Sequence, residues 1–128
     1  MRVPNGGRNW ETQGADPYLA AESARLQIRG VQSQGVQSTI KHFLLNEQEV
    51  NRYSSSSNVD DRTLHEIYLK PFAAAIDEGV AAIMCSYNSI NGTNACENPI
   101  ALGKILRDQL GFRGLVMTDW DGNGFHVS

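Results

Sequence analysis

The sequence lacks long hydrophobic runs and lacks an excess of either charge. No apolar stretch approaches the roughly 18 residues that a membrane-spanning helix requires, so no membrane association is predicted. Eleven Lys and Arg stand against 14 Asp and Glu, which leaves no concentration of positive charge for a nucleic-acid partner. Hydrophobic residues make up 41% of the 128 residues and charged residues 20%, as in ordinary folded domains, which excludes wholesale disorder.

The two ends of the chain also lack features of a complete secreted protein. Residues 1–11 are polar and glycine-rich and contain no apolar segment of the kind found in a signal peptide. The chain ends at Ser128, a few residues after an apolar run and without a further helix. We therefore expect residues 1–128 to be a fragment of a longer protein.

Cysteine is scarce, since only Cys85 and Cys96 are present. Two cysteines provide neither a disulfide framework nor the spacing of a metal site, so no metal is predicted. A bridge between them would close a loop of about 11 residues and contribute roughly 3 kcal/mol, whereas the alternative is two unpaired thiols. The sequence Asn91-Gly92-Thr93 lies inside this loop, predicts N-glycosylation at Asn91 and favours the bridge.

Helical patterns alternate with short apolar runs along the chain. The helices are predicted at residues 16–35, 60–79 and 98–111, and the strands at 36–43, 80–86 and 114–118. Asp16-Pro17 and Asn98-Pro99 combine a capping side chain with a proline in the first helical turn, which is typical of helix starts. The second and third strands are continuously apolar, as strands buried on both faces are.

Several local features give more specific expectations. The apolar face of the first helix is predicted to contain Leu19, Ala20, Ser23, Leu26 and Gly30. Thr63 and Glu66 fit a capping box, and Pro71 is expected to kink the second helix. The serines at 54–57 predict a surface loop.

This alternation predicts an α/β fold with a parallel sheet. A (β/α)8 TIM-type barrel needs about 250 residues, so the chain would form about half of one. An open doubly wound sheet is the alternative; it would carry helices on both faces, whereas a closing sheet carries them on one. No Gly-x-Gly-x-x-Gly follows a strand, which weakens a dinucleotide-binding interpretation, and no cofactor is predicted.

Reactive side chains follow each predicted strand. Lys41-His42 ends the first, residues 84–88 (Met-Cys-Ser-Tyr-Asn) end the second, and residues 118–121 (Thr-Asp-Trp-Asp) end the third. Because the carboxyl ends of parallel strands share one edge of the sheet, we expect these side chains to converge on one pocket. A carboxylate with aromatic neighbours suits a neutral polyhydroxylated ligand.

Each of these residues also has a structural interpretation. Asp119 could cap a following helix, Lys41 could be a solvated strand end, Tyr87 and Trp120 could belong to the core, and Arg8 could lie on the surface. As a catalytic group, Asp119 could be the nucleophile of a retaining glycosidase, kept ionised by Lys41. Such an enzyme needs a second carboxyl group about 5–5.5 Å away. No spacing argument selects Glu47 or Glu49 for that role.

Four segments in order carry a family resemblance: residues 6–11 (Gly-Gly-Arg-Asn-Trp-Glu), residues 41–43 with 46–49 (Asn-Glu-Gln-Glu), residues 84–88, and residues 111–120. With these segments, from Gly6 to Trp120, the chain resembles the N-terminal barrel domain of glycoside hydrolase family 3, and within it the fungal β-glucosidases. The 46–49 segment favours the β-glucosidase branch over the xylosidase and hexosaminidase branches.

The resemblance implies a role for each matching residue. Asp119 matches the nucleophile, and Arg8, Lys41 and His42 match residues that bind the sugar in the −1 subsite. Met84 and Tyr87 match further lining of that subsite, Trp120 matches its aromatic wall, and Cys85 and Cys96 match a disulfide of secreted fungal members. The implied substrates are β-glucosides or short gluco-oligosaccharides, with no cofactor or metal, and the implied location of the full-length form is extracellular.

Departures from the family pattern matter equally. Family members take the acid/base glutamate from a later domain, and this chain lacks that domain, the first barrel strands and the sugar-binding aspartate that should precede Arg8. Thr118 stands where serine is commoner, and residues 121–126 do not follow the family. We therefore expect a fragment that is inactive without the remaining domains. The alternatives are a β-xylosidase or other family member, a non-catalytic sugar-binding remnant, or a chain whose open sheet edges prevent folding.

Overall fold

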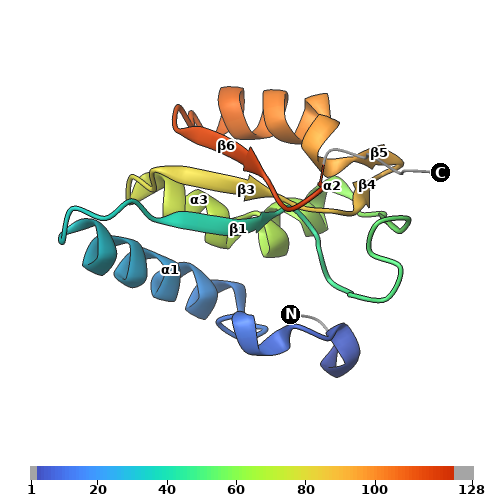
Figure 1. The fold of residues 1–128 in the computed structure, drawn as a ribbon, viewed down its shortest axis with the longest axis horizontal. Helices are drawn as coiled ribbons and strands as arrows, with labels where there is room; N and C mark the ends of the chain where they lie inside the picture. The colour runs from blue at the N-terminus through green and yellow to red at the C-terminus, as the bar shows by residue number, and fades with distance from the viewer. Residues whose placement is uncertain (1–2, 123–128) are drawn as a thin grey trace.

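The computed structural model describes residues 3–122 and contains a three-stranded parallel sheet (Figure 1). Its strands are β1 (Thr39–Phe43), β3 (Ala82–Cys85) and β6 (Leu115–Thr118), in the spatial order β1-β3-β6. Both strand pairs are parallel. The predicted alternation of helices and parallel strands is therefore confirmed.

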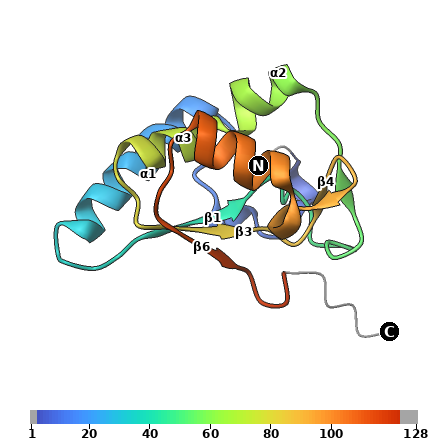
Figure 2. The ribbon, with the colours of Figure 1, turned by 90° about the horizontal axis from the view of Figure 1, so that it is seen from above.

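The larger helices cover one face of this sheet (Figure 2). They are α1 (Pro17–Gln32), α3 (Lys70–Asp77) and the π-helix η5 (Pro99–Gln109). Right-handed crossovers place successive helices on the same side when the sheet curves toward closure. The one-sided arrangement is that of a partial barrel and excludes the doubly wound alternative.

The predicted helix starts are confirmed. The Asp16 carboxylate accepts hydrogen bonds from the backbone amides of Tyr18 and Leu19, and Pro17 follows it. The Asn98 side chain does the same for the amides of Ile100 and Ala101. Short side-chain acceptors satisfy amides that have no partner within the helix, so this signal is local and readable from sequence.

The predicted apolar face of α1 is wrong. Its buried residues are Ala21, Ala24 and Ile28, whereas Leu19 and Leu26 are exposed. Helix α1 packs against α3, and the small alanine side chains let the two helices approach. The choice of contact face therefore follows from the neighbouring helix and not from the largest apolar residues.

The second predicted helix consists of three segments: α2 (Asp61–Thr63), the π-helical η3 (Leu64–Tyr68) and α3. The backbone amide of Leu69 donates to the carbonyl of Leu64 at 2.8 Å, which is the wide turn of a π-helix. Pro71, expected to kink a continuous helix, instead lies in the first turn of α3, where its missing N–H is tolerated. The break thus precedes the proline.

The predicted capping box is also replaced. The Asp60 carboxylate accepts from the Thr63 amide at 2.9 Å, so aspartate is the capping residue. Glu66 instead pairs with Arg62 at 3.0 Å. Asp60, three residues before Thr63, therefore caps the helix in place of the predicted Thr63–Glu66 box.

The serine-rich segment is not wholly a loop. Ser56–Ser57 forms strand β2 in a second small sheet with β4 (Ser89–Ile90) and β5 (Thr93–Asn94), in the order β2-β4-β5. The Ser57 hydroxyl donates to the carbonyl of Leu45 at 2.8 Å. Strand pairing uses backbone groups, so a segment without apolar side chains can pair when a partner strand is available.

The two faces of the main sheet differ. Phe43, Ile83 and Leu106 lie in the core between sheet and helices. The opposite face carries the register row Lys41–Met84–Met117. Leu115 on β6 is 60% exposed, so the expectation that this strand is buried on both faces is wrong for β6 and holds for the central strand β3. Strand β6 is an edge strand with nothing described over this face.

Shorter elements complete the chain. The 3-10 segments η1 (Pro4–Gly6) and η2 (Asn9–Glu11) precede α1, and η4 (Ala95–Glu97) precedes η5. Among residues 3–122 no helix combines the length and apolar character needed to cross a membrane. Most of the predicted departure at 121–126 lies outside the described residues.

Candidate functional site

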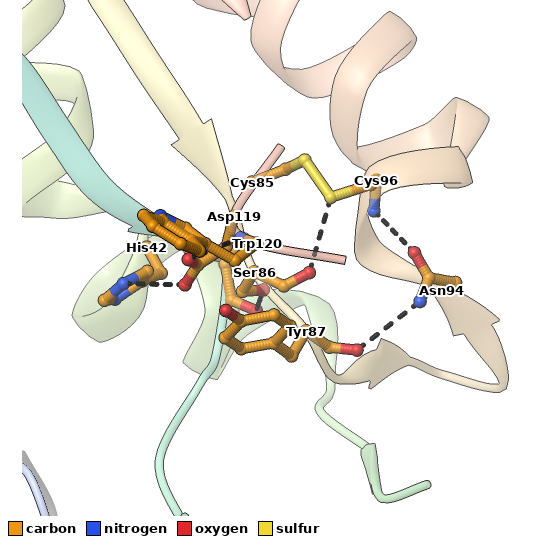
Figure 3. The surroundings of a disulfide bond; sticks show 9 residues. His42, Cys85, Ser86, Tyr87, Asn94, Cys96, Asp119 and Trp120 are labelled. Carbon is orange, nitrogen blue, oxygen red and sulfur yellow. Dashed lines mark hydrogen bonds and ion pairs between the residues drawn. A yellow bond between two sulfur atoms is a disulfide. The ribbon is translucent and has the colours of Figure 1, made fainter. Parts of the chain in front are cut away.

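The carboxyl ends of β1, β3 and β6 are held together by backbone hydrogen bonds beyond the paired strands. The amide of Ser86 donates to the carbonyl of Phe43 at 2.8 Å, and the amide of Asp119 donates to the carbonyl of Cys85 at 3.3 Å. Figure 3 shows the resulting cluster of side chains at this edge of the sheet. The strand ends therefore meet as the sequence predicted.

A bulge in β1 sets the position of His42. Lys41 is paired with Met84 and Phe43 with Cys85, so His42 has no counterpart on β3. Regular alternation would send the side chains of neighbouring residues to opposite faces, whereas an extra residue in one strand re-aims them. Both Lys41 and His42 border the same cavity.

Asp119 is a buried carboxylate surrounded by polar contacts. Its residue is 7% exposed. The His42 Nε2 atom lies 3.0 Å from Oδ2, and the backbone amide of Trp120 donates to Oδ1 at 2.8 Å (Figure 3). The Tyr87 hydroxyl also interacts with this carboxylate. Such contacts offset the large cost of removing an ionised carboxylate from water.

The surroundings of Asp119 shift two pKa values. Burial lowers the pKa of His42 to about 4, although the negative charge of Asp119 opposes this shift. The imidazole is therefore neutral at neutral pH. Burial, followed by the interaction with Asp119, raises the pKa of the Tyr87 hydroxyl, so this hydroxyl keeps its proton.

Lys41 contacts a different carboxylate from the one expected. Its Nζ lies 2.8 Å from Glu11 Oε2, whereas the sequence suggested that it would keep Asp119 ionised. The Arg8 guanidinium also binds Glu11, through Nε and Nη2, at 2.7 Å in each case. Hydrogen bonds from Arg8, then from Lys41, lower the pKa of Glu11 to about 2. Glu11, which has no role predicted from the sequence, lies between the two cations and binds both.

A second polar cluster was missed by the sequence analysis. Arg52 donates to Glu49 at 2.8 Å, and its guanidinium carbon lies 4.1 Å from the centre of the Tyr87 ring. The Tyr53 ring lies 4.7 Å from that of Tyr87. Arg8 Nη1 is 3.9 Å from Glu49, which connects this cluster to the first. Glu49 and Arg52 are oppositely charged and three residues apart, as are Arg8 and Glu11, and this spacing could have predicted both ion pairs from the sequence.

Two glycines allow the first segment to approach this cluster. The amide of Glu49 donates to the carbonyl of Gly6 at 3.1 Å. Gly7 has a φ of +98°, and a Cβ there would lie 2.8 Å from Glu49 Cγ. A side chain at Gly7 is therefore disfavoured both by its backbone conformation and by its neighbour.

The disulfide expected from sequence is present. Cys85 and Cys96 are bonded, which ties the end of β3 to η4 (Figure 3). Cys96 Sγ also lies 3.5 Å from the carbonyl of Ser86. A Cβ at Gly122 would lie 3.3 Å from Cys96 Sγ and 3.1 Å from the Asp119 carbonyl, so the turn after Asp119 rests against the disulfide.

The remaining predicted residues lie at the periphery. Trp120 is 83% exposed and is not part of the core. Met84 is half-buried on the helix-free face of the sheet, beside Lys41 in the register row. Within residues 3–122 no group of three His, Cys, Asp or Glu side chains is arranged to hold a metal ion.

A cavity of about 550 Å³ lies between α1, β1 and η3. Arg8, Glu11, Lys41 and His42 are among its lining residues, together with apolar residues such as Ile28, Val31 and Phe72 and polar residues such as Gln27 and Ser38. Asp119, Met84, Tyr87 and Trp120 are not among its lining residues. The cavity therefore meets the cation cluster but not the buried carboxylate, and the expectation that all the strand-end side chains converge on one pocket is wrong for this cavity.

Parallel strands with helices on one face and polar side chains gathered at the carboxyl edge define a part of a β/α-barrel domain. Residues 1–124 match the model of the glycosyl hydrolase family 3 N-terminal domain. The chain therefore belongs to glycosyl hydrolase family 3.

Individual relatives agree with this assignment. Beta-glucosidase cel3A of Pyricularia oryzae is 62% identical over 120 residues, which cover 94% of this chain and 16% of that protein. The crystal structure of a beta-D-glucoside glucohydrolase from Trichoderma reesei matches with a TM-score of 0.93 at 57% identity, covering 94% of this chain and 17% of that one. The structure of DesR, a beta-glucosidase from Streptomyces venezuelae in complex with D-glucose, matches with a TM-score of 0.92 at 47% identity, covering 94% and 15%. This chain thus spans about one sixth of the length of these relatives.

The disulfide should stabilise the strand end. Replacing both Cys85 and Cys96 by alanine opens a loop of 11 residues, and we expect a loss of about 3 kcal/mol in the free energy of unfolding. Urea denaturation of the oxidised chain and of the double variant measures the difference. Reduction of the unmodified chain should reproduce the loss, and an unchanged midpoint in both experiments would contradict a stabilising role.

The low pKa of His42 predicts acid sensitivity. The unfolded chain binds a proton at its ordinary pKa of 6.5, whereas folded His42 does so only near pH 4. Stability from this residue is therefore complete above pH 6.5 and is lost as the pH falls toward 4, by up to about 3 kcal/mol. Urea denaturation between pH 7 and pH 4.5 measures it, and His42→Gln should flatten the profile.

His65 provides the control for this experiment. A hydrogen bond that its ring donates to the Asp61 backbone carbonyl raises the pKa of His65, so its contribution has the opposite sign and is lost as the pH rises. His65→Gln should therefore leave the acid loss in place. An acid loss that persists in His42→Gln would assign it to another group.

Proposed function

We propose that this chain supplies the nucleophile side of the active site of a retaining β-glucosidase. The observation that carries the proposal is Asp119, a buried carboxylate at the carboxyl edge of the sheet with His42, Tyr87 and the Trp120 amide against it. Family membership and the similarity to β-glucosidases support the same conclusion.

The proposed reaction is a double displacement. An oxygen of Asp119 attacks the anomeric carbon, the bond to the leaving-group oxygen breaks with its electron pair, and a glycosyl ester forms on Asp119. A carboxylic acid protonates the departing oxygen in this step. Water then attacks the anomeric carbon and loses a proton to the carboxylate that the acid became in the first step. This second step releases β-glucose and free Asp119.

The two carboxylates bound to the cations of this region, Glu11 and Glu49, are unsuited to the acid role. Glu11, with a pKa of about 2 and two cationic partners, is ionised at neutral pH and has no proton to donate. Glu49 is paired with Arg52 at 2.8 Å. We therefore assign the acid/base group to another part of a longer protein and expect the 128-residue chain alone to have little or no hydrolytic activity.

We assign sugar binding to Arg8, Lys41 and His42 and to the residues next to Asp119. Arg8 and Lys41 supply N–H donors to sugar hydroxyls in the −1 subsite, His42, Met84 and Tyr87 contribute to its lining, and the exposed Trp120 ring provides a stacking wall. β-Glucosides or short gluco-oligosaccharides are the proposed substrates. The β-glucosidase DesR was solved with D-glucose, which supports this substrate class.

The nucleophile assignment is tested in a graft: the Pyricularia oryzae cel3A enzyme in which residues 3–122 of this chain replace the matching segment. The graft should hydrolyse p-nitrophenyl β-D-glucoside, and Asp119→Asn should lower kcat by about 10³-fold or more because the amide cannot form the glycosyl ester. A dinitrophenyl 2-fluoroglucoside should label the unmodified graft once, at Asp119, as mass spectrometry shows.

Asp108→Asn is the matched control, since Asp108 is an exposed aspartate of η5. It should retain both activity and labelling. Labelling at another residue, or hydrolysis undiminished by Asp119→Asn, would overturn the assignment. Glucose binding without turnover or labelling would instead support a non-catalytic sugar-binding function.

We also assign the full-length form to an oxidising, extracellular location with a glycan on Asn91. The disulfide between Cys85 and Cys96 fits such a compartment. Asn91 is exposed in the turn between β4 and β5, where a glycan would not displace core residues. Its amide also exchanges two hydrogen bonds with the backbone of Val59, so replacing Asn91 would disturb the turn itself.

Thr93→Ala therefore provides the cleaner test of glycosylation. Thr93 is exposed, and its replacement removes the acceptor sequence while keeping Asn91 and its contacts. In the graft secreted from a eukaryotic host, this variant should lose the mass of one glycan relative to the unmodified protein. Ser89→Ala, which leaves the acceptor sequence intact, should not. Equal masses for the unmodified graft and Thr93→Ala would refute glycosylation at Asn91.

A further inference from the structure

We propose that Glu11 is a positioning residue that fixes the Arg8 guanidinium and the Lys41 ammonium for contact with sugar hydroxyls. The inference rests on the proposed function and deepens it, because it assigns to one carboxylate the orientation of both cations. Neither composition nor the strand-end pattern pointed to Glu11.

The geometry is that of a carboxylate shared between two chain segments. Arg8 and Glu11 lie three residues apart around η2, and the guanidinium approaches both carboxylate oxygens at 2.7 Å. Lys41, on β1 and 30 residues later, approaches Oε2 at 2.8 Å. Glu11 therefore determines where a flexible N-terminal arginine lies relative to a lysine of the sheet.

Both cations retain donors after binding Glu11. A guanidinium has five N–H groups, of which Glu11 takes two, and an ammonium has three, of which it takes one. Arg8 and Lys41 side chains are partly exposed at 31% and 42%. Long cationic side chains lose considerable rotamer freedom when a ligand immobilises them, so fixing them beforehand favours binding. Sugar hydroxyls accept such hydrogen bonds.

A purely structural role for Glu11 is the competing explanation, and the chain contains a matched control. Glu78 binds Arg29 with the same forked geometry, at 2.8 and 2.9 Å, and its side chain is 17% exposed compared with 18% for Glu11. The Glu78–Arg29 pair joins α1 to the end of α3 and is not among the residues bordering the cavity. Removing the Glu78–Arg29 pair therefore measures how far the loss of a comparable ion pair, by itself, changes the activity.

The test compares Glu11→Gln and Glu78→Gln in the graft, using p-nitrophenyl β-D-glucoside and its 2-, 3-, 4- and 6-deoxy analogues. In the unmodified graft, removing a hydroxyl held by Arg8 or Lys41 should lower kcat/KM by about 10–100-fold. In Glu11→Gln, kcat/KM for the complete glucoside should fall by a similar factor, and the penalty for the same deoxy analogue should shrink to less than about threefold. Glu78→Gln should change neither quantity.

A uniform loss of kcat/KM for every substrate in Glu11→Gln, or an equal loss in Glu78→Gln, would overturn the positioning role. An inactive unmodified graft would contradict the proposed function, and the decision on Glu11 would then rest on glucose affinity measured by calorimetry. A glucose affinity weakened about tenfold or more by Glu11→Gln but not by Glu78→Gln would support the inference. The same glucose affinity in the two variants, or no measurable binding in either, would overturn it.

Discussion

The burial of the Asp119 carboxylate is the constraint on which the rest of the site depends. A carboxylate at 7% exposure is tolerated only with polar partners, and these come from three separate places in the chain: the β1 bulge, the segment after β3 and the residue after Asp119 itself. The parallel sheet brings these places together because its strands end at one edge. The fold is thus the means by which distant residues satisfy one charge.

The two carboxylates of the site differ in their surroundings and therefore in what they can do. Asp119 faces a neutral imidazole, a phenol and a backbone amide, so its charge is stabilised by dipoles. Glu11 faces two cations, which neutralise it and hold its pKa near 2. A carboxylate among neutral donors is available to react with an electrophilic carbon, whereas one held between an arginine and a lysine serves to organise them.

Helix caps and the parallel arrangement of the strands were predictable from the sequence, whereas several specific long-range contacts were not. Asp16 and Asn98 cap helices through hydrogen bonds to amides two or three residues away, so the residues next to each helix start are enough to predict them. The buried face of α1 depends on α3, and the pairing of Ser56–Ser57 depends on β4, which no local pattern reports. At the site, the residue types at the strand ends were foreseen. The partner of Lys41 was not, because Glu11 lies 30 residues earlier, and neither was the stacking of Arg52 on Tyr87.

The close contact between Gly7 and Glu49 has a practical consequence for anyone redesigning this region. The loop that carries Glu49 and Arg52 rests on a surface too tight for even a methyl group, so the two segments behave as one interlocking piece. Substitutions of Gly7 that keep the Glu49 segment fixed would bring the new Cβ into collision with the Glu49 side chain. Joint exchange of both segments, taken from a single donor sequence, would preserve the fit.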